Sequence, residues 1–329
     1  MKPAIIPVAT MLAVHMLAPS ARAAAPQDVP LQLTLPSPDP AQLAQATAPD
    51  GSVPAPVPAT APMYSGSGFI ANWLNTANQA QAMQPHWMTP LVTVTPRLEQ
   101  EIRYDQYWEK RGNGSDLDIF DAGKGLELIP TLTNEILINP PAYQEKVNVG
   151  KPVSGWLDDQ FLVVKQRLLT ANEQEGNYIV TAFLGVTAPS GNENFTNGAW
   201  IITPTIAGGK GWGDFDVQAT SGIGIPTRNQ STYGTVWSTN IAFQYHLYEY
   251  FWPEFEINHT WWATGNERGG KNQVFLTPGI MFGRFTIKDR IKFNIGFGYQ
   301  GAVLPKYTVT SEQTPAYNHA WILSARLTF

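Results

Sequence analysis

The sequence contains no cysteine, and only 14% of its 329 residues are charged. Without thiols the chain cannot form disulfides, bind zinc through thiolates, carry a lipid on cysteine or use a cysteine nucleophile. The net charge is −5 and no Lys/Arg-rich run is present, which argues against nucleic acid as a partner. Metal-ligand spacings such as His-x-x-x-His and Gly-rich phosphate loops are missing too, so we expect no metal and no cofactor.

Long apolar runs are also missing once the first residues are passed. No later segment has eighteen consecutive apolar residues, so the sequence predicts no membrane-spanning helix in the mature chain. Residues 1–23 combine Lys2, an apolar stretch and the small residues Ala21 and Ala23, which is typical of a cleaved secretory signal. The chain is therefore predicted to be exported.

Two segments without period-two alternation follow the predicted signal. Residues 24–62 are rich in Pro, Ala and Gln and lack aromatic residues, which predicts a disordered periplasmic tether. In the lead-in segment, residues 63–90, Phe69, Ile70, Trp73 and Leu74 share one helical face. This segment is interpreted as a short amphipathic helix at the membrane surface, a plug in a lumen, or a loop.

From about Leu91 to the end, apolar and polar residues alternate, which indicates β-strands. In "RIKFNIGFGYQGAV", for example, Ile291, Phe293, Ile295 and Phe297 alternate with polar or small residues. About twelve strands are predicted, near residues 91–109, 115–129, 133–142, 155–170, 177–189, 197–208, 214–226, 235–250, 253–263, 273–284, 290–303 and 317–329. Many exceed ten residues, whereas strands of soluble proteins usually have five or six and strands that cross a bilayer need about nine to eleven.

The connections and the aromatic residues favour a transmembrane barrel over a secreted β-sandwich or soluble barrel. Short turns such as "TIKD" alternate with long polar loops such as "TGNERGGKN", and aromatic residues cluster near strand ends. The final "AWILSARLTF" is an alternating strand that ends on Phe329. We therefore predict an all-β fold: residues 91–329 form a transmembrane antiparallel up-and-down barrel of about twelve strands, with both termini on the short-turn side.

Several stretches resemble a family of outer-membrane barrels named after the meta-pathway of phenol degradation. They are "PHWMTPLVTVTPRLEQEIRYDQYW", "GKGLELIP", "FLVVKQRLLTANEQEGNYIVTAFLG", "TPTIAGGKGWGDFDVQ" and "YNHAWILSARLTF", so the resemblance covers roughly Pro85 to Phe329. It implies location in the bacterial outer membrane and transport of hydrophobic or aromatic compounds, but it brings no functional residues. The aromatic ending also looks like the assembly signal that the barrel-assembly machinery reads, which makes Phe329 the predicted signal residue.

If apolar residues face lipid, the opposite face lines the lumen with charges of both signs. The lumen candidates are Arg97, Glu99, Glu101, Arg103, Asp105, Glu127, Lys165, Arg167, Asp214, Asp216, His246, Glu254, Glu256, Arg290, Lys292 and Arg326. They are expected mostly to brace the barrel as a hydrogen-bonded network, beside which a restricted, water-filled path for small solutes remains.

Three functions stay open at this point, and the preferred one is passive passage of small solutes, aromatic or hydrophobic ones among them. A structural or adhesive barrel with a closed lumen is the alternative. A lipid-modifying enzyme is weaker, because His259, the histidine expected near the outer lipid interface, has Trp261 and not serine two residues on. No catalytic residue is therefore predicted, and the expected partners are outer-membrane lipid, the assembly machinery and a small-molecule solute.

Overall fold

The structure is a computed structural model, and it describes residues 68–111, 116–121, 125–147, 153–156, 159–192, 195–266, 268–304 and 317–329. The predicted signal (1–23) and tether (24–62) lie outside the described residues. Fifteen β segments and two helices are described. They are α1 (Phe69–Ala82), β1 (Glu101–Lys110), β2 (Asp116–Phe120), β3 (Gly125–Leu128), β4 (Asn134–Ile138), β5 (Tyr143–Val147), β6 (Val153–Trp156), β7 (Asp159–Ala171), β8 (Tyr178–Ala188), β9 (Ile201–Trp212), β10 (Phe215–Pro226), α2 (Gln230–Tyr233), β11 (Val236–Tyr245), β12 (Phe251–Trp262), β13 (Asn272–Lys288), β14 (Ile291–Leu304) and β15 (His319–Thr328).

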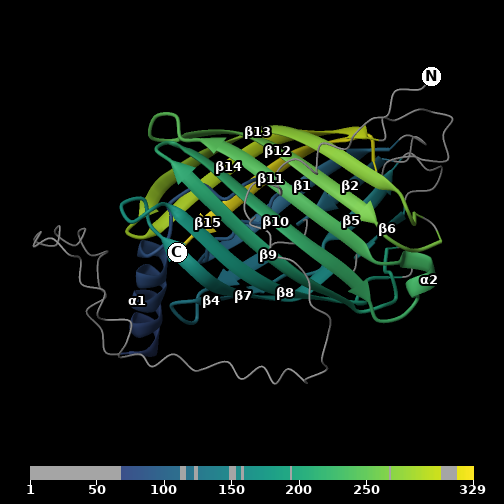
Figure 1. The fold of residues 1–329 in the computed structure, drawn as a ribbon, viewed down its shortest axis with the longest axis horizontal. Helices are drawn as coiled ribbons and strands as arrows, with labels where there is room; N and C mark the ends of the chain where they lie inside the picture. The colour runs from purple at the N-terminus through teal and green to yellow at the C-terminus, as the bar shows by residue number, and fades with distance from the viewer. Residues whose placement is uncertain are drawn as a thin grey trace, which may run out of the picture. The chain divides into compact units, whose positions relative to one another are not determined.

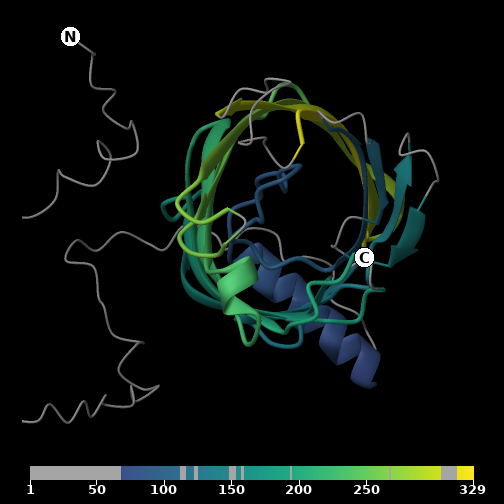
Figure 2. The same ribbon diagram turned by 90° about the vertical axis from the view of Figure 1, so that its right-hand side faces the viewer.

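The sheet closes on itself, because β15 pairs antiparallel with β1 from Glu101↔Thr328 to Lys110↔His319. Figure 2 shows the resulting ring of strands. Three barrel strands are each interrupted, so that β2 with β3, β4 with β5 and β6 with β7 count as one strand apiece. The fifteen segments therefore make a closed antiparallel barrel of twelve strands, and the predicted fold class is confirmed.

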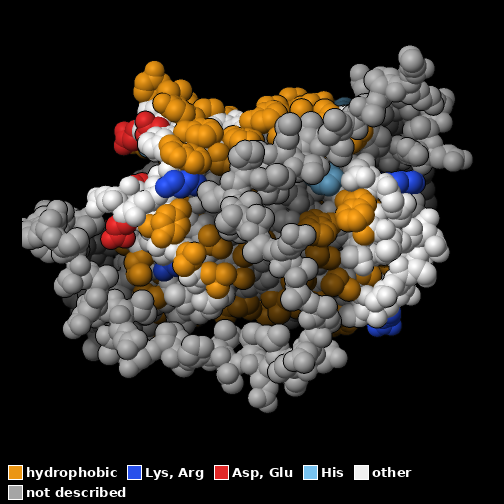
Figure 3. Space-filling view, viewed as in Figure 1, with side chains coloured by type: hydrophobic (Ala, Val, Ile, Leu, Met, Phe, Trp, Pro, Cys, Tyr) orange, Lys and Arg blue, Asp and Glu red, His pale blue; other side chains and the backbone are white. Residues whose placement is uncertain are grey.

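Residues on the barrel wall alternate between the interior and the exterior, as the period of two requires. On β1, Glu101, Arg103 and Asp105 are buried, while the side chains of Ile102 and Tyr104 between them are exposed. Figure 3 shows hydrophobic side chains spread over the visible barrel wall. Such a polar interior and apolar exterior are typical of a barrel whose outer surface contacts lipid.

Aromatic pairs gather at both ends of this apolar wall. At the end that carries the C-terminus, Trp212 and Phe215 stack with ring centroids 6.2 Å apart. At the opposite end, Trp237 lies 6.4 Å from Trp261. Rings in two belts suit the two membrane interfaces, where an amphipathic side chain has one dry and one wet side.

Helix α1 lies at the barrel end that carries the C-terminus (Figure 1). Trp73 Nε1 donates to the carbonyl oxygen of Ile129, 2.8 Å away in the β3–β4 turn. Ala77 and Ala80 pack against Ile129 and Leu98. Neither helix that the structure describes is long and apolar enough to cross a membrane.

Candidate functional site

The chain enters the lumen after α1 and stays there until β1 begins. Residues 83–100, which we call the inner segment, lie inside the ring of strands in Figure 2. The first strand therefore starts at Glu101 and not near Leu91, which corrects the predicted boundary. Pro90 and Pro96 explain the difference, because proline has no N–H to donate to a sheet ladder.

Two wall carboxylates on β12 accept hydrogen bonds from the inner segment. Glu254 Oε1 lies 3.0 Å from the Leu91 nitrogen. The two oxygens of Glu256 accept from the Val92 nitrogen at 2.7 Å and from the Thr93 nitrogen at 2.6 Å. The Thr93 hydroxyl also donates to Glu256. These carboxylates take the place of sheet partners for backbone donors that are buried in the barrel.

Wall cations bind the carbonyl oxygens of the same stretch. Arg326 on β15 donates to the carbonyl oxygens of Thr89 and Pro90, the latter at 2.6 Å. On β1, Arg103 donates to the carbonyl oxygen of Leu91 at 2.5 Å. Wall side chains of opposite charge thus bind the backbone of the inner segment: carboxylates accept from its N–H groups, and guanidinium groups donate to its carbonyl oxygens.

Leu91 packs where the opposing strands carry glycine. A Cβ built at Gly279 would lie 2.4 Å from Leu91 Cδ1, and one at Gly298 would lie 2.7 Å from the same atom. A Cβ built at Gly296 would lie 2.8 Å from the other methyl carbon of Leu91, Cδ2. The glycines of β13 and β14 therefore leave the space that this side chain fills.

Trp87 packs in the same way against β9. A Cβ at Gly209 would lie 2.5 Å from its Cζ3 atom, and one at Gly211 would lie 2.7 Å from its Nε1 atom. The Gly-rich stretch "GGKGWG" thus belongs to a strand that accommodates an indole ring, and only its end forms a turn.

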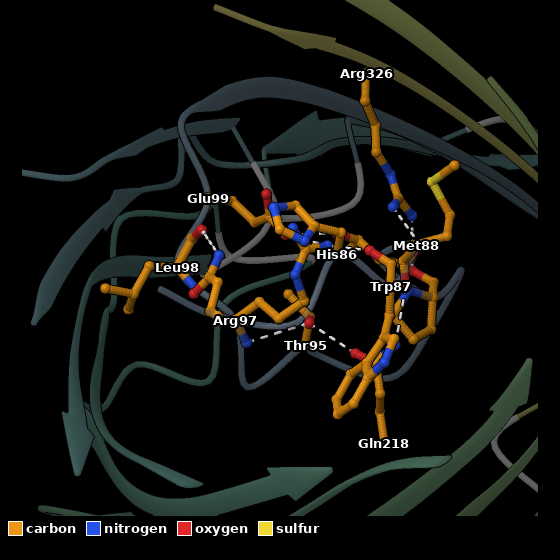
Figure 4. Close-up of polar contacts among 12 residues, drawn as sticks. His86, Trp87, Met88, Thr95, Arg97, Leu98, Glu99, Gln218 and Arg326 are labelled. Carbon is orange, nitrogen blue, oxygen red and sulfur yellow. Dashed lines mark hydrogen bonds and ion pairs between the residues drawn. The ribbon is translucent and has the colours of Figure 1, made fainter. Parts of the chain in front are cut away.

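Figure 4 shows polar contacts of both halves of the inner segment. Gln218 on β10 donates to the Met88 carbonyl oxygen at 2.9 Å and accepts from the Thr95 hydroxyl at 2.7 Å. Arg97 pairs with Glu99 at 3.1 Å and also donates to the Trp87 carbonyl oxygen. The segment therefore folds back on itself, and one wall glutamine joins its two arms.

Other predicted charges pair along the wall. Lys165 on β7 lies 2.7 Å from Glu135 and 3.6 Å from Glu127, and its ammonium also donates to the Arg97 carbonyl oxygen at 3.3 Å. Arg103 pairs with Asp105 at 2.9 Å.

At the end that carries α1, two contacts join the wall to the helix and the start of the inner segment. Arg167 donates to the carbonyl oxygen of Ala80 at 2.7 Å. His86 Nδ1 lies 2.9 Å from Glu173 Oε2 in the β7–β8 turn, and the His86 backbone N–H donates to the same carboxylate. Burial on its own raises the pKa of Glu173, but the hydrogen bonds from His86 outweigh it and lower that pKa to about 2.

The inner segment separates two cavities. The inner cavity, of about 590 Å³, lies on the α1 side and is rich in charge; its lining includes Arg97, Arg284, Lys292, Glu99 and Glu101. The outer cavity, of about 320 Å³, is lined by eleven described residues, none of which is charged. They include four side-chain amides and four aromatic rings: Asn240, Asn258, Gln273, Gln300, Tyr107, Trp262, Phe275 and Tyr317.

An apolar cluster lies between these cavities. Met88 and Leu91 of the inner segment pack with Trp252, Met281 and Ile322 of the wall. Met88 lines the inner cavity, whereas Val92, which packs against the cluster, lines the outer one. Residues of this one apolar layer therefore border both cavities.

The predicted lumen residues fall into three groups. Arg97 and Glu99 belong to the inner segment and not to a strand. Asp214 and His246 lie in turns and not on lumen-facing strand positions, because the strands before them end at Trp212 and Tyr245; Arg290 likewise lies in the turn before β14. The remaining candidates face the lumen from the wall: Glu101, Arg103, Asp105, Glu127, Lys165, Arg167, Asp216, Glu254, Glu256, Lys292 and Arg326.

Phe329 and His259 have contacts of their own. The Phe329 nitrogen donates to the Gln100 carbonyl oxygen at 3.1 Å, and its carbonyl oxygen accepts from Arg290 at 2.7 Å, which ties the last residue to the start of β1. His259 Nε2 lies 2.9 Å from Asn272 Oδ1. Among the described residues, no group of three or more His, Cys, Asp or Glu could hold a metal ion.

The family described as "Putative MetA-pathway of phenol degradation" matches residues 141–307, just over half of the chain. No curated protein matches the chain.

Three solved structures that resemble the fold are distant in sequence. An outer membrane channel from Pseudomonas putida F1 is 15% identical, with a TM-score of 0.45, over 70% of this chain and 94% of that one. The NanC porin is 8% identical, with a TM-score of 0.43, over 69% of this chain and 98% of that one. The KdgM porin, in complex with disordered oligogalacturonate, is 7% identical, with a TM-score of 0.38, over 69% of this chain and 99% of that one.

Proposed function

Because the chain belongs to the family described as "Putative MetA-pathway of phenol degradation", we propose that it is a bacterial outer-membrane channel for small solutes, aromatic or hydrophobic ones among them. The predicted signal exports it, and the barrel-assembly machinery inserts it with α1 on the periplasmic side. It performs no chemistry on the solute.

One observation carries the proposal: the lumen holds two cavities on opposite sides of a segment that is not part of the wall. The inner segment is joined covalently to the barrel wall only where Gln100 leads into β1, and its central contacts are hydrogen bonds and apolar packing. A hydrogen bond to a charged group contributes about 1.5–3 kcal/mol, and such contacts break reversibly. Displacement of the inner segment therefore connects the cavities, and the segment acts as the gate.

The buried charges that hold the segment favour a second candidate, a structural barrel whose lumen stays closed. Glu254, Glu256 and Arg326 are nearly inaccessible to solvent and each bonds the inner segment. Contacts of this number and kind suit a permanently seated plug as well as a gate that opens rarely.

Conductance distinguishes the two candidates. The purified full chain is inserted in planar bilayers, and liposomes that contain it are assayed for uptake of phenol. The channel function predicts discrete current steps and protein-dependent uptake. Absence of both, with protein that runs as a folded barrel, contradicts it and supports the closed structural barrel.

A further inference from the structure

We propose that the outer cavity is a binding site for uncharged ring compounds that carry hydroxyl groups, and that it discriminates against the corresponding anions. The proposal deepens the channel function and rests on it for the route by which the solute arrives. It is drawn from the chemistry of the cavity lining, whose described residues combine amides, hydroxyls and aromatic rings without a charged side chain.

The amides form an oriented chain along the cavity wall. The Tyr317 hydroxyl donates to Gln300, Gln300 Nε2 donates to Asn258 Oδ1 at 2.8 Å, and Asn258 Nδ2 donates to Asn240 Oδ1 at 3.2 Å. Asn240 ends the chain, and its own Nδ2 makes no hydrogen bond among the described residues. A solute hydroxyl that accepts from this group completes the series.

Flat apolar surface lies beside the amide chain. The rings of Phe275 and Tyr317 stack with centroids 4.4 Å apart, and Val92 of the inner segment lines the same cavity. A ring-shaped solute can place one face on these groups while its hydroxyls reach the amides. Sites of this kind bind small molecules through apolar walls and a few placed polar groups.

Among the described residues, the charged groups around the outer cavity do not favour an anion. Glu256 lies 3.4 Å from Asn258 Nδ2, on the side of the inner segment. Glu109 and Arg111 pair with each other at 2.9 Å, and Arg268 lies over the Trp262 ring at 5.0 Å; none of the three lines the cavity. A carboxylate in the cavity would lose hydration without gaining a counter-ion from the described residues that line it.

The inner cavity provides the contrast, because Arg97, Arg284 and Lys292 line it together with acidic residues. The two sides of the gate therefore differ in chemistry. A solute that enters from outside meets the uncharged cavity first, and selection by charge takes place before the gate.

Equilibrium dialysis tests the site without any need for transport. Phenol, glucose and benzoate are each dialysed at pH 7 against the folded full chain in detergent. The two neutral probes share a hydroxylated ring, and benzoate supplies a matched anion. We expect phenol, glucose or both to bind one per barrel and at least ten-fold more tightly than benzoate.

Two variants assign the binding to the outer cavity. Asn240→Leu should weaken it at least five-fold, whereas Asn294→Leu, the same change in a residue that lines the inner cavity, should leave it unchanged. If Asn240→Leu does not fold, Trp262→Leu takes its place. Binding of only one neutral probe supports the site and identifies the ring type.

Three results would overturn the proposal: benzoate bound as tightly as the neutral probes, no probe bound, or equal loss in the Asn240 and Asn294 variants. Because the readout is binding, a barrel that binds phenol but carries no current contradicts only the channel function.

Discussion

Arg326, in the last strand, donates from Nη2 to the carbonyl oxygen of Pro90 at 2.6 Å, although 236 positions separate the two residues. The same guanidinium donates to the Thr89 carbonyl oxygen. One side chain of the closing strand thus holds the two residues that lie between Met88 and Leu91, the inner-segment members of the apolar cluster. If this segment is the gate, Arg326 sets how often it opens.

Arg326→Lys should raise the open probability of the channel. Lysine keeps the charge but replaces a planar fork with a single ammonium, so that the two carbonyl oxygens cannot both be held in the same geometry. Loss of one hydrogen bond to a charged group costs about 1.5–3 kcal/mol, which corresponds to a ten-fold or larger shift toward the open state. Single-channel recordings measure the open probability.

The matched control is Arg228→Lys in the exposed segment before α2. It should leave the open probability at the wild-type value. An Arg326→Lys channel that opens no more often than wild type contradicts the role of this contact.

Glu256→Gln should loosen the inner segment around Val92 and Thr93. The substitution removes the charge and one of two acceptor oxygens that serve three donors of the inner segment. Hydrogen exchange followed by mass spectrometry should show exchange at residues 92–93 faster by about ten-fold. Thr93→Val removes only the hydroxyl contact and should give a smaller increase in the exchange rate. Equal exchange rates in wild type and Glu256→Gln would show that this carboxylate does not hold the segment.

Gly209→Ala should destabilise the barrel by overpacking Trp87. The added Cβ would lie 2.5 Å from Cζ3 of the indole and 3.0 Å from the Val217 carbonyl oxygen, so the ring must move. We expect a loss of about 1–3 kcal/mol in unfolding free energy and a changed tryptophan emission spectrum. Gly224→Ala is the control, since its nearest atom would lie 3.5 Å away, which is an ordinary contact. The interpretation fails if both variants are equally stable.

The contact between Glu173 and His86 should weaken in acid. The pKa of Glu173 is lowered from 4.5 to about 2 in the folded chain, so its carboxylate stabilises the fold above pH 4.5 and loses that effect as the pH falls through about 2. Unfolding free energies of wild type and Glu173→Gln should therefore differ most above pH 4.5 and converge near pH 2. A difference that stays constant over this range would assign the effect to packing and not to charge.

Alternation of polar and apolar residues was sufficient to predict the barrel, because burial on one face and lipid on the other impose a strict period of two. The same rule failed between Leu91 and Gln100. There "LVTVTPRLEQ" also alternates. A segment inside a barrel can place its apolar side chains against apolar groups and its polar side chains against polar groups without being a strand. Pro90 and Pro96 were the available signal, as they interrupt any ladder.

The candidate site was predictable in composition but not in its contacts. Charges of both signs on the inward face indicated a network, yet Glu254, Glu256 and Arg326 bind backbone atoms of the inner segment and not one another. Such pairings depend on which chain segment occupies the lumen, and periodicity carries no information on that point. The glycines at 279, 296 and 298 acquire their meaning only once Leu91 is placed among them.

A reversible lock tests the gate most directly. The chain has no cysteine, so Leu91→Cys with Gly279→Cys introduces the only thiols, at positions where a Cβ on residue 279 would lie 2.4 Å from the Leu91 side chain. The contacting Leu91 atom is Cδ1, two bonds beyond Cβ, so the Cβ–Cβ separation exceeds 2.4 Å and comes within reach of the separation of about 3.5–4.5 Å that a disulfide needs. Each single-cysteine variant serves as a control for the loss of packing.

Current through the double variant in planar bilayers is then compared under oxidising and reducing conditions. The account predicts that oxidation abolishes current, that reduction restores it, and that neither single variant responds to redox conditions. Equal conductance in the oxidised and reduced double variant, with the disulfide verified by mass spectrometry, would contradict the claim that the inner segment gates the channel.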